Sequence, residues 1–164
     1  MCLYIQNGMP MLKHRKATIG DALLYHKWAN EKEVRSSSFQ SGEISLEDHM
    51  KWFEKKISDP ACIMLLFEGD DQMPAGQVRL QAEEEDSYVI GISVDAAHRG
   101  KGYASAMLLA ASEYFFGLHP QGKIHAYIKQ DNFASVRAFE NAGYSNPVSL
   151  QVNGINSYRY TKTK

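Results

Sequence analysis

The chain has 164 residues, of which 44% are hydrophobic and 23% are charged, and its formal net charge is −1 at pH 7. This composition is typical of an ordinary globular protein that is long enough to bury a core. It has no basic excess that would indicate a nucleic-acid partner, no stretch of about 20 apolar residues that would span a membrane, and no signal-peptide pattern. We therefore expect one cytoplasmic domain over residues 1–164, in which residues 1–10 form a loose N-terminal segment.

The first half of the chain combines helical and extended patterns. A short strand is predicted over residues 12–16, and a helix begins after the N-cap residue Asp21 and ends near Asn30. Residues 31–42 are polar and predict a loop or a broken helix. Ser45 begins a second helix that Asp59-Pro60 ends. Three strands joined by short turns follow, and they cover residues 61–67, 75–81 and 88–94.

The second half begins with a polar, glycine-bearing turn over residues 95–102, which a helix follows. The remaining predicted elements are a strand, a short helix and a hairpin around Asn153-Gly154, over residues 124–129, 132–141 and 148–161. Strands joined by short turns are antiparallel neighbours, whereas a strand–helix–strand unit forms a right-handed parallel crossover. The order predicts a mixed α/β fold, with a mostly antiparallel twisted sheet and helices on both faces.

The turn His98-Arg99-Gly100-Lys101-Gly102-Tyr103-Ala104 lies between a predicted strand and a predicted helix. Free N–H groups at a helix N-terminus attract an anion, and glycines let the backbone approach it closely. Arg99 and Lys101 add positive charge, and an arginine can bind a phosphate with two hydrogen bonds. The alternative is a glycine turn with solvated charges. The segment matches neither a P-loop nor the three-glycine dinucleotide fingerprint.

The same turn resembles the Arg/Gln-x-x-Gly-x-Gly/Ala motif of the Gcn-related N-acetyltransferase (GNAT) superfamily, with Arg99, Gly102 and Ala104 at the defined positions. Downstream, Asn132, Ser135, Phe139 and the run Ala142-Gly143-Tyr144 resemble the second signature of that family. The two motifs span roughly residues 88–144. The resemblance implies a GNAT-like fold, acetyl-CoA as co-substrate and direct acetyl transfer to an amine.

The resemblance also implies where acetyl-CoA binds. Its pyrophosphate would lie on backbone N–H groups of the turn, and its pantetheine arm would run between the strands over residues 88–94 and 124–129. A backbone N–H near Val94 would stabilise the oxyanion. The implied cofactor-binding residues are Ile92, Val94, Arg99, Gly100, Lys101, Gly102, Tyr103, Ala104, Asn132, Ser135 and Phe139.

The residues for proton transfer are less well defined, because many members place a tyrosine where this chain has Phe139. Ser135 is the candidate acid or thiol-positioning group, although it could simply be a small residue beside CoA. His49 and Tyr127 are the candidates for base or proton relay, with a surface histidine and a water chain as alternatives. The histidines show no metal-ligand spacing, so no metal site is predicted.

The N-terminal third resembles acetyltransferases of nucleotide-linked amino sugars of the pseudaminic-acid pathway type. The resemblance rests on Trp28-x-Asn30, Val34-Arg35, Ser38-Phe39, Ile44-Ser45, His49 and Trp52-Phe53. It implies a small-molecule amine acceptor, with Trp28, Asn30, Arg35, Phe39 and Arg79 as substrate-binding residues; the alternative for each tryptophan is core packing.

Three other functions remain open: acetylation of protein N-termini as in the ribosomal-protein enzymes, acetylation of antibiotics or polyamines, and a CoA-binding module without turnover. The terminal hairpin offers an edge strand that could pair two copies into a homodimer.

Overall fold

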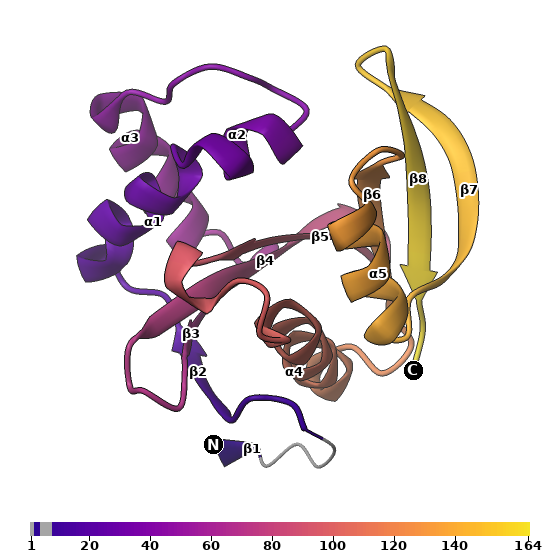
Figure 1. Ribbon diagram of the computed structural model, residues 1–164, viewed down its shortest axis with the longest axis horizontal. Helices are drawn as coiled ribbons and strands as arrows, with labels where there is room; N and C mark the ends of the chain where they lie inside the picture. Colours follow the sequence, from indigo (N-terminus) through magenta and orange to yellow (C-terminus); the bar gives the residue numbers. More distant parts are fainter. Residues whose placement is uncertain (1, 4–7) are drawn as a thin grey trace.

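The computed structural model describes residues 2–3 and 8–164, and its strands form one eight-stranded sheet (Figure 1). The order across the sheet is β1-β2-β3-β4-β5-β6-β8-β7, and β5–β6 is the parallel pair among otherwise antiparallel neighbours. The strands are β1 (Cys2–Leu3), β2 (Leu12–Lys16), β3 (Cys62–Glu68), β4 (Pro74–Glu84), β5 (Ser87–Val94), β6 (Lys123–Lys129), β7 (Ser145–Val152) and β8 (Ile155–Lys162). The predicted mixed, mostly antiparallel α/β fold is confirmed.

The N-terminal segment predicted over residues 1–10 is only partly described. Cys2 and Leu3 pair with Lys13 and Leu12 of β2. The prediction for residues 1 and 4–7 lies outside the described part of the chain.

The helices lie on both faces of the sheet. One group comprises the 3-10 turn η1 (Ile19–Asp21), α1 (Ala22–Ala29), α2 (Lys32–Ser37) and α3 (Leu46–Ile57). The other comprises the 3-10 turn η2 (Ala96–His98), α4 (Tyr103–Leu118) and α5 (Phe133–Asn141). Figure 1 shows α1–α3 gathered at one side of the molecule, away from α4 and α5. The segment predicted as a loop or broken helix over residues 31–42 therefore contains one short helix, α2.

The sheet separates these helical layers, and a hydrophobic core lies on each of its faces. The side chains of β3 alternate between them: Leu65 and Phe67 pack in the core with α4, whereas Met64 and Leu66 pack in the core with α1 and α3. This explains why β3 is a continuous apolar run, since a strand covered on both faces has no solvent-facing side.

Local signals in the sequence account for two of the element ends. The Ser45 side chain accepts a hydrogen bond from the Asp48 backbone N–H and so caps α3. Asn153 and Gly154 have φ angles of 48° and 77°, which is the backbone that a two-residue hairpin turn requires between β7 and β8.

The parallel seam between β5 and β6 is short. It pairs Ser87, Tyr88 and Val89 with Lys123, Ile124 and His125, and no pairing continues toward Val94. From Ala126 onward, β6 keeps its pairing with β8 on its other side. The two strands therefore diverge in the middle of the sheet. Among the helices of the described residues, none is long and apolar enough to cross a membrane.

Candidate functional site

The turn between β5 and α4 adopts the conformation of an anion-binding loop. Gly100 and Gly102 have φ angles of 71° and 82°, in the left-handed region that glycine tolerates best. Gly102 is also the N-cap of the 16-residue helix α4. The first N–H groups of a helix have no intrahelical partner, and a turn of this kind directs such groups toward one point. The turn is thus suited to hold a phosphate by its backbone.

The divergent strands supply a second feature that fits acetyl-CoA. The Asp95 N–H donates to the Ala75 carbonyl oxygen at 2.8 Å, so the alternation along β5 turns the backbone groups of Ile92 and Val94 away from β4. They face the side where β6 has separated. The Val94 carbonyl oxygen accepts from Arg99 Nε at 3.0 Å, which leaves the Val94 N–H and the backbone groups of Ile92. A pantetheine arm carries amide groups and can pair with these remaining groups as an added strand would.

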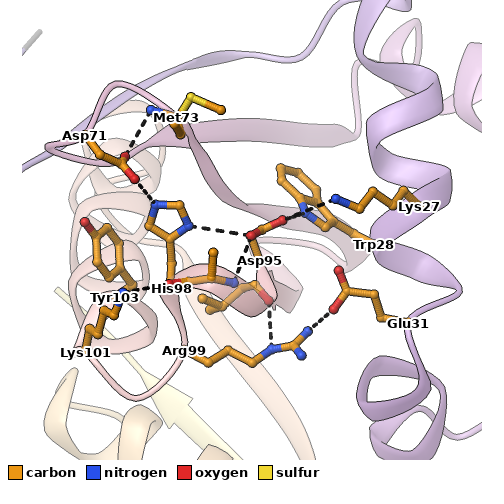
Figure 2. Close-up of polar contacts among 12 residues, drawn as sticks. Lys27, Trp28, Glu31, Asp71, Met73, Asp95, His98, Arg99, Lys101 and Tyr103 are labelled. Atoms are coloured by element: carbon orange, nitrogen blue, oxygen red, sulfur yellow. Dashed lines mark hydrogen bonds and ion pairs between the residues drawn. The ribbon is translucent and has the colours of Figure 1, made fainter.

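The Arg99 side chain does not point at this anion site. Its guanidinium donates to Glu33 at 2.9 Å, to Glu31, and through Nε to the Val94 carbonyl oxygen at 3.0 Å. Figure 2 shows it directed toward Glu31 at the start of α2. Two carboxylates bind the guanidinium in this arrangement, so the bidentate phosphate contact expected of Arg99 would require these ion pairs to break and stays a prediction. The exposed Lys101 donates to the Ala97 carbonyl oxygen at 2.8 Å.

Polar contacts hold the turn from its other side (Figure 2). The Tyr103 hydroxyl donates to Asp70 at 2.7 Å, and burial together with this contact raises the pKa of Tyr103 to about 12. His98 Nε2 lies 2.9 Å from Asp71, in the β3–β4 turn. The Tyr103 side chain, predicted to bind cofactor, therefore anchors α4 to that turn, and only its backbone remains in the anion site.

A hydrogen bond also links the turn to α1. The Trp28 indole N–H donates to Asp95 at 2.8 Å, and Trp28 is only 1% exposed. Burial acts against ionisation of Asp95, but hydrogen bonds from Trp28 and the Ala97 N–H hold its pKa below the ordinary value. Sequence reasoning missed Asp95 and His98 as supports of the turn, since nothing in their local spacing indicates their distant partners.

An open hollow of about 570 Å³ borders this outer side of the turn, and its lining includes Asp70, Asp71 and His98. Lys101 also lines the hollow, but the two carboxylates would repel a phosphate there, so the N-terminus of α4 is the better candidate for the anion site.

The second signature lies on α5. Asn132 is its N-cap, and its side-chain oxygen accepts from the Ser135 N–H at 3.2 Å. Ser135 is half-buried, and its hydroxyl makes no hydrogen bond with the described residues. Phe139 is buried and packs edge-on against Tyr144. Asn132 thus orients the first turn of α5, where the serine hydroxyl stays available.

Three of the predicted substrate-binding residues are occupied by internal contacts. Trp28 lies in the core, as described above. The Asn30 side chain donates to the Ile44 carbonyl oxygen at 2.9 Å and accepts from the Ile44 N–H at 2.8 Å. Arg35 donates to the Gly42 carbonyl oxygen and to the Ser38 hydroxyl. These contacts shape the segment between α1 and α3 and leave these side chains few groups for a substrate.

The other two predicted substrate residues remain accessible to different degrees. Phe39 is half-buried beyond the end of α2. The Arg79 guanidinium lies 5.3 Å from the centre of the Trp52 ring, and Trp52 itself is 36% exposed.

The candidate proton-transfer residues are not brought together. His49 is 3% exposed, stacks on Phe53 and donates from Nε2 to the Ala22 carbonyl oxygen at 2.9 Å. Burial lowers its pKa. This geometry gives His49 a structural part in joining α1 to α3. It shows that His49 is not the surface histidine of the alternative, and it does not favour the predicted role as a base.

Tyr127 lies on β6, on the sheet face that His125 shares and opposite Ala126. Its hydroxyl is 3.4 Å from a Glu83 carboxylate oxygen, and burial followed by the charge of Glu83 raises its pKa. A tyrosine with a raised pKa can pass a proton but is a weak base at neutral pH. The described residues contain no cluster of three metal-ligating side chains.

Comparison with known proteins identifies the family of the chain. The profile described as "Acetyltransferase (GNAT) domain" matches residues 12–145. The spermidine N(1)-acetyltransferase of Vibrio cholerae is 25% identical over 130 residues, which cover 76% of this chain and 73% of that protein.

Solved structures share the fold at lower identity. The spermidine N-acetyltransferase of Vibrio cholerae in complex with CoA and spermine superposes with a TM-score of 0.82 at 23% identity, covering 92% of this chain and 94% of the other. The aminoglycoside acetyltransferase AAC(6')-Ib, in complex with paromomycin and acetyl-CoA, has a TM-score of 0.81 at 15% identity and covers 93% of each chain.

Proposed function

This chain belongs to the acetyltransferase (GNAT) domain family and is an acetyl-CoA-dependent N-acetyltransferase, and we propose that its acceptor is a primary amine of a small molecule. One structural combination carries the proposal: two left-handed glycines precede α4, and β5 separates from β6 after Val89. The first suits a pyrophosphate, and the second suits an extended amide-bearing arm.

Binding in this proposal depends mainly on backbone groups. The N–H groups from Arg99 to Ala104 hold the pyrophosphate with the help of the α4 dipole. The backbone of Ile92 and Val94 pairs with the pantetheine arm and places the thioester near the end of β5. Asn132 and Phe139 border the same arm from α5.

The chemistry is a direct transfer. The neutral amine attacks the thioester carbonyl carbon, the Val94 N–H stabilises the oxyanion, and the carbon–sulfur bond breaks as the amide forms. The thiolate leaves as CoA and takes up a proton. Ser135 is the proposed donor or thiol-positioning group, because Phe139 has no proton to give and the serine hydroxyl has no other partner among the described residues.

The amine loses a proton in the same reaction. We assign this step to a water chain that ends at Tyr127 and Glu83, whose oxygens lie 3.4 Å apart. His49 is left out of the chemistry, since its ring is buried and hydrogen-bonded to Ala22.

The identity of the amine acceptor is a separate part of the proposal. Spermidine and paromomycin are named for the similar proteins above, whereas none of those proteins is named for a nucleotide sugar. The nucleotide-linked amino sugar predicted from the N-terminal third therefore lacks support from the comparisons, and its predicted contacts Trp28, Asn30 and Arg35 are used internally.

The test is an assay of CoA thiol release from acetyl-CoA with four amines: spermidine, an aminoglycoside, a UDP-4-amino-4,6-dideoxy sugar and an N-terminal ribosomal peptide. Transfer to any of the first three supports the proposal and selects the acceptor. Transfer to the peptide alone would overturn the small-molecule acceptor. CoA binding without transfer to any amine, in this panel or a wider one, would indicate a binding module.

A further inference from the structure

The sheet face beneath α1 and α3 contains an arginine that lacks an acidic partner. Val78 and Leu80 of β4 point into the core with α4, so Arg79 between them lies on the opposite face. There its guanidinium lies 5.3 Å from the centre of the Trp52 ring. Burial lowers the pKa of Arg79, and the Cys62 thiol opposes this shift.

Two other arginines of the chain have the acidic partners that Arg79 lacks. Arg15 makes two hydrogen bonds to Asp21 at 2.7 and 2.8 Å, and Arg99 is bound by Glu31 and Glu33. Arg79 forms no hydrogen bond or ion pair with any residue in the ranges 2–3 and 8–164. A guanidinium has five N–H donors, and an aromatic face satisfies none of them as a hydrogen-bond acceptor would.

Space lies beside Arg79. Gly91 of β5 is its direct cross-strand partner, and a Cβ added at Gly91 would meet nothing within 4 Å. Residues paired across two strands point to the same face, so this open space adjoins the guanidinium. It also lies at the part of β5 that has separated from β6, where the acetyl group would arrive in the proposed function.

A buried polar atom without a partner lies on the same face. Gln77 lies two residues before Arg79 on β4, and its amide nitrogen donates to the Ser93 hydroxyl at 3.3 Å. Its amide oxygen is buried and has no hydrogen-bond partner among the described residues. The face thus has five cationic donors on Arg79 next to open space and, two residues earlier on β4, one buried acceptor on Gln77 without a partner.

We propose that Arg79 binds an oxyanion, carboxylate or phosphate, on the amine acceptor, with Gln77 accepting from a hydroxyl or amine of the same molecule. The inference rests on the proposed function and restricts the class of amine that can be the acceptor. The acceptor then carries both an amine and an anion, whereas a purely cationic amine would be repelled by Arg79.

Binding can be measured without turnover. The protein is first saturated with CoA, so that the α4 turn is filled, and is then titrated with inorganic phosphate or acetate while tryptophan fluorescence is recorded. The cation–π contact between Arg79 and Trp52 predicts a change in Trp52 emission that Arg79→Gln and Trp52→Phe each abolish. Arg137→Gln removes the same charge from an exposed position on α5 and is the matched control. An absent response in the wild type, or one that Arg79→Gln retains, overturns the inference.

Turnover then compares amines that differ in one anion: glucosamine 6-phosphate with glucosamine, and lysine with cadaverine. We expect the anionic member of one pair to be preferred, and Arg79→Gln to raise its KM at least 10-fold without changing the KM for acetyl-CoA. Arg79→Lys should recover part of the loss. Preference for the neutral or cationic members, unaltered by Arg79→Gln, would overturn the inference and leave acetyl transfer intact; anion binding without any transfer would instead overturn the proposed function.

Discussion

The turn in front of α4 and the helical layer of α1–α3 present their polar groups in opposite ways. The turn exposes backbone N–H groups, and Gly100 and Gly102 fix their direction. The helical layer uses its polar side chains internally, as Trp28 does with Asp95 and His49 with Ala22. A motif that specifies backbone conformation therefore predicts function more directly than a set of side-chain types, because the partner of a side chain depends on the whole fold.

The largest expected effect tests the helical layer. Trp28→Ala removes a fully buried indole and its hydrogen bond to Asp95, and should lower the free energy of unfolding by about 3–5 kcal/mol. Trp52→Ala is the control at a partly exposed site and should cost much less. Urea unfolding of both variants measures the difference. Equal costs would contradict the structural part assigned to Trp28.

The next effect tests the turn. Gly102→Val forces a β-branched side chain into a backbone with φ of 82° and should weaken CoA binding by about 100-fold, which is about 2.7 kcal/mol. Calorimetric titration with CoA measures it. In the control Gly117→Ala, a Cβ within α4 meets nothing within 4 Å, so CoA binding should be retained. Retained affinity in Gly102→Val would remove the turn from the cofactor site.

A smaller effect tests the contact between the two regions. Glu31→Gln together with Glu33→Gln frees Arg99 and removes two negative charges near the anion site. The KM for acetyl-CoA should fall by about 3- to 10-fold, as expected for partly exposed charges. Glu47→Gln on α3 is the control. A rise in KM would show that the glutamates hold the turn in its binding conformation.

The smallest effect concerns pH. Burial lowers the pKa of His49 in the folded protein, so the unfolded state binds more protons below about pH 6.5, the ordinary histidine value. The free energy of unfolding should therefore fall between pH 7 and 5, because protonation of His49 favours the unfolded state. Unfolding of the wild type and His49→Gln at both pH values checks this, because the variant should lose less.

The same variant separates structure from catalysis. His49→Gln keeps a donor for the Ala22 carbonyl oxygen and should leave the shape of the pH–rate profile unchanged. A lost acidic limb, where activity falls as the base becomes protonated, would return His49 to the mechanism.

Local signals predicted most of the fold. The strand over residues 12–16, the Ser45 cap and the Asn153-Gly154 hairpin follow from short-range backbone preferences, and the structure has each of them. The partners of Arg99 and Trp28 are 68 and 67 residues away in the chain, respectively. No local pattern encodes such contacts, so the sequence indicated the residue types but not whether they face a ligand or the protein.

The open seam between β5 and β6 has a consequence for how the protein responds to its co-substrate. A sheet paired along its whole width would be more stable, yet it would leave no room for an extended ligand. In the proposed function, the pantetheine arm would pair with Ile92 and with the Val94 N–H where β6 does not, so that binding of acetyl-CoA would extend the pairing of β5 toward its end.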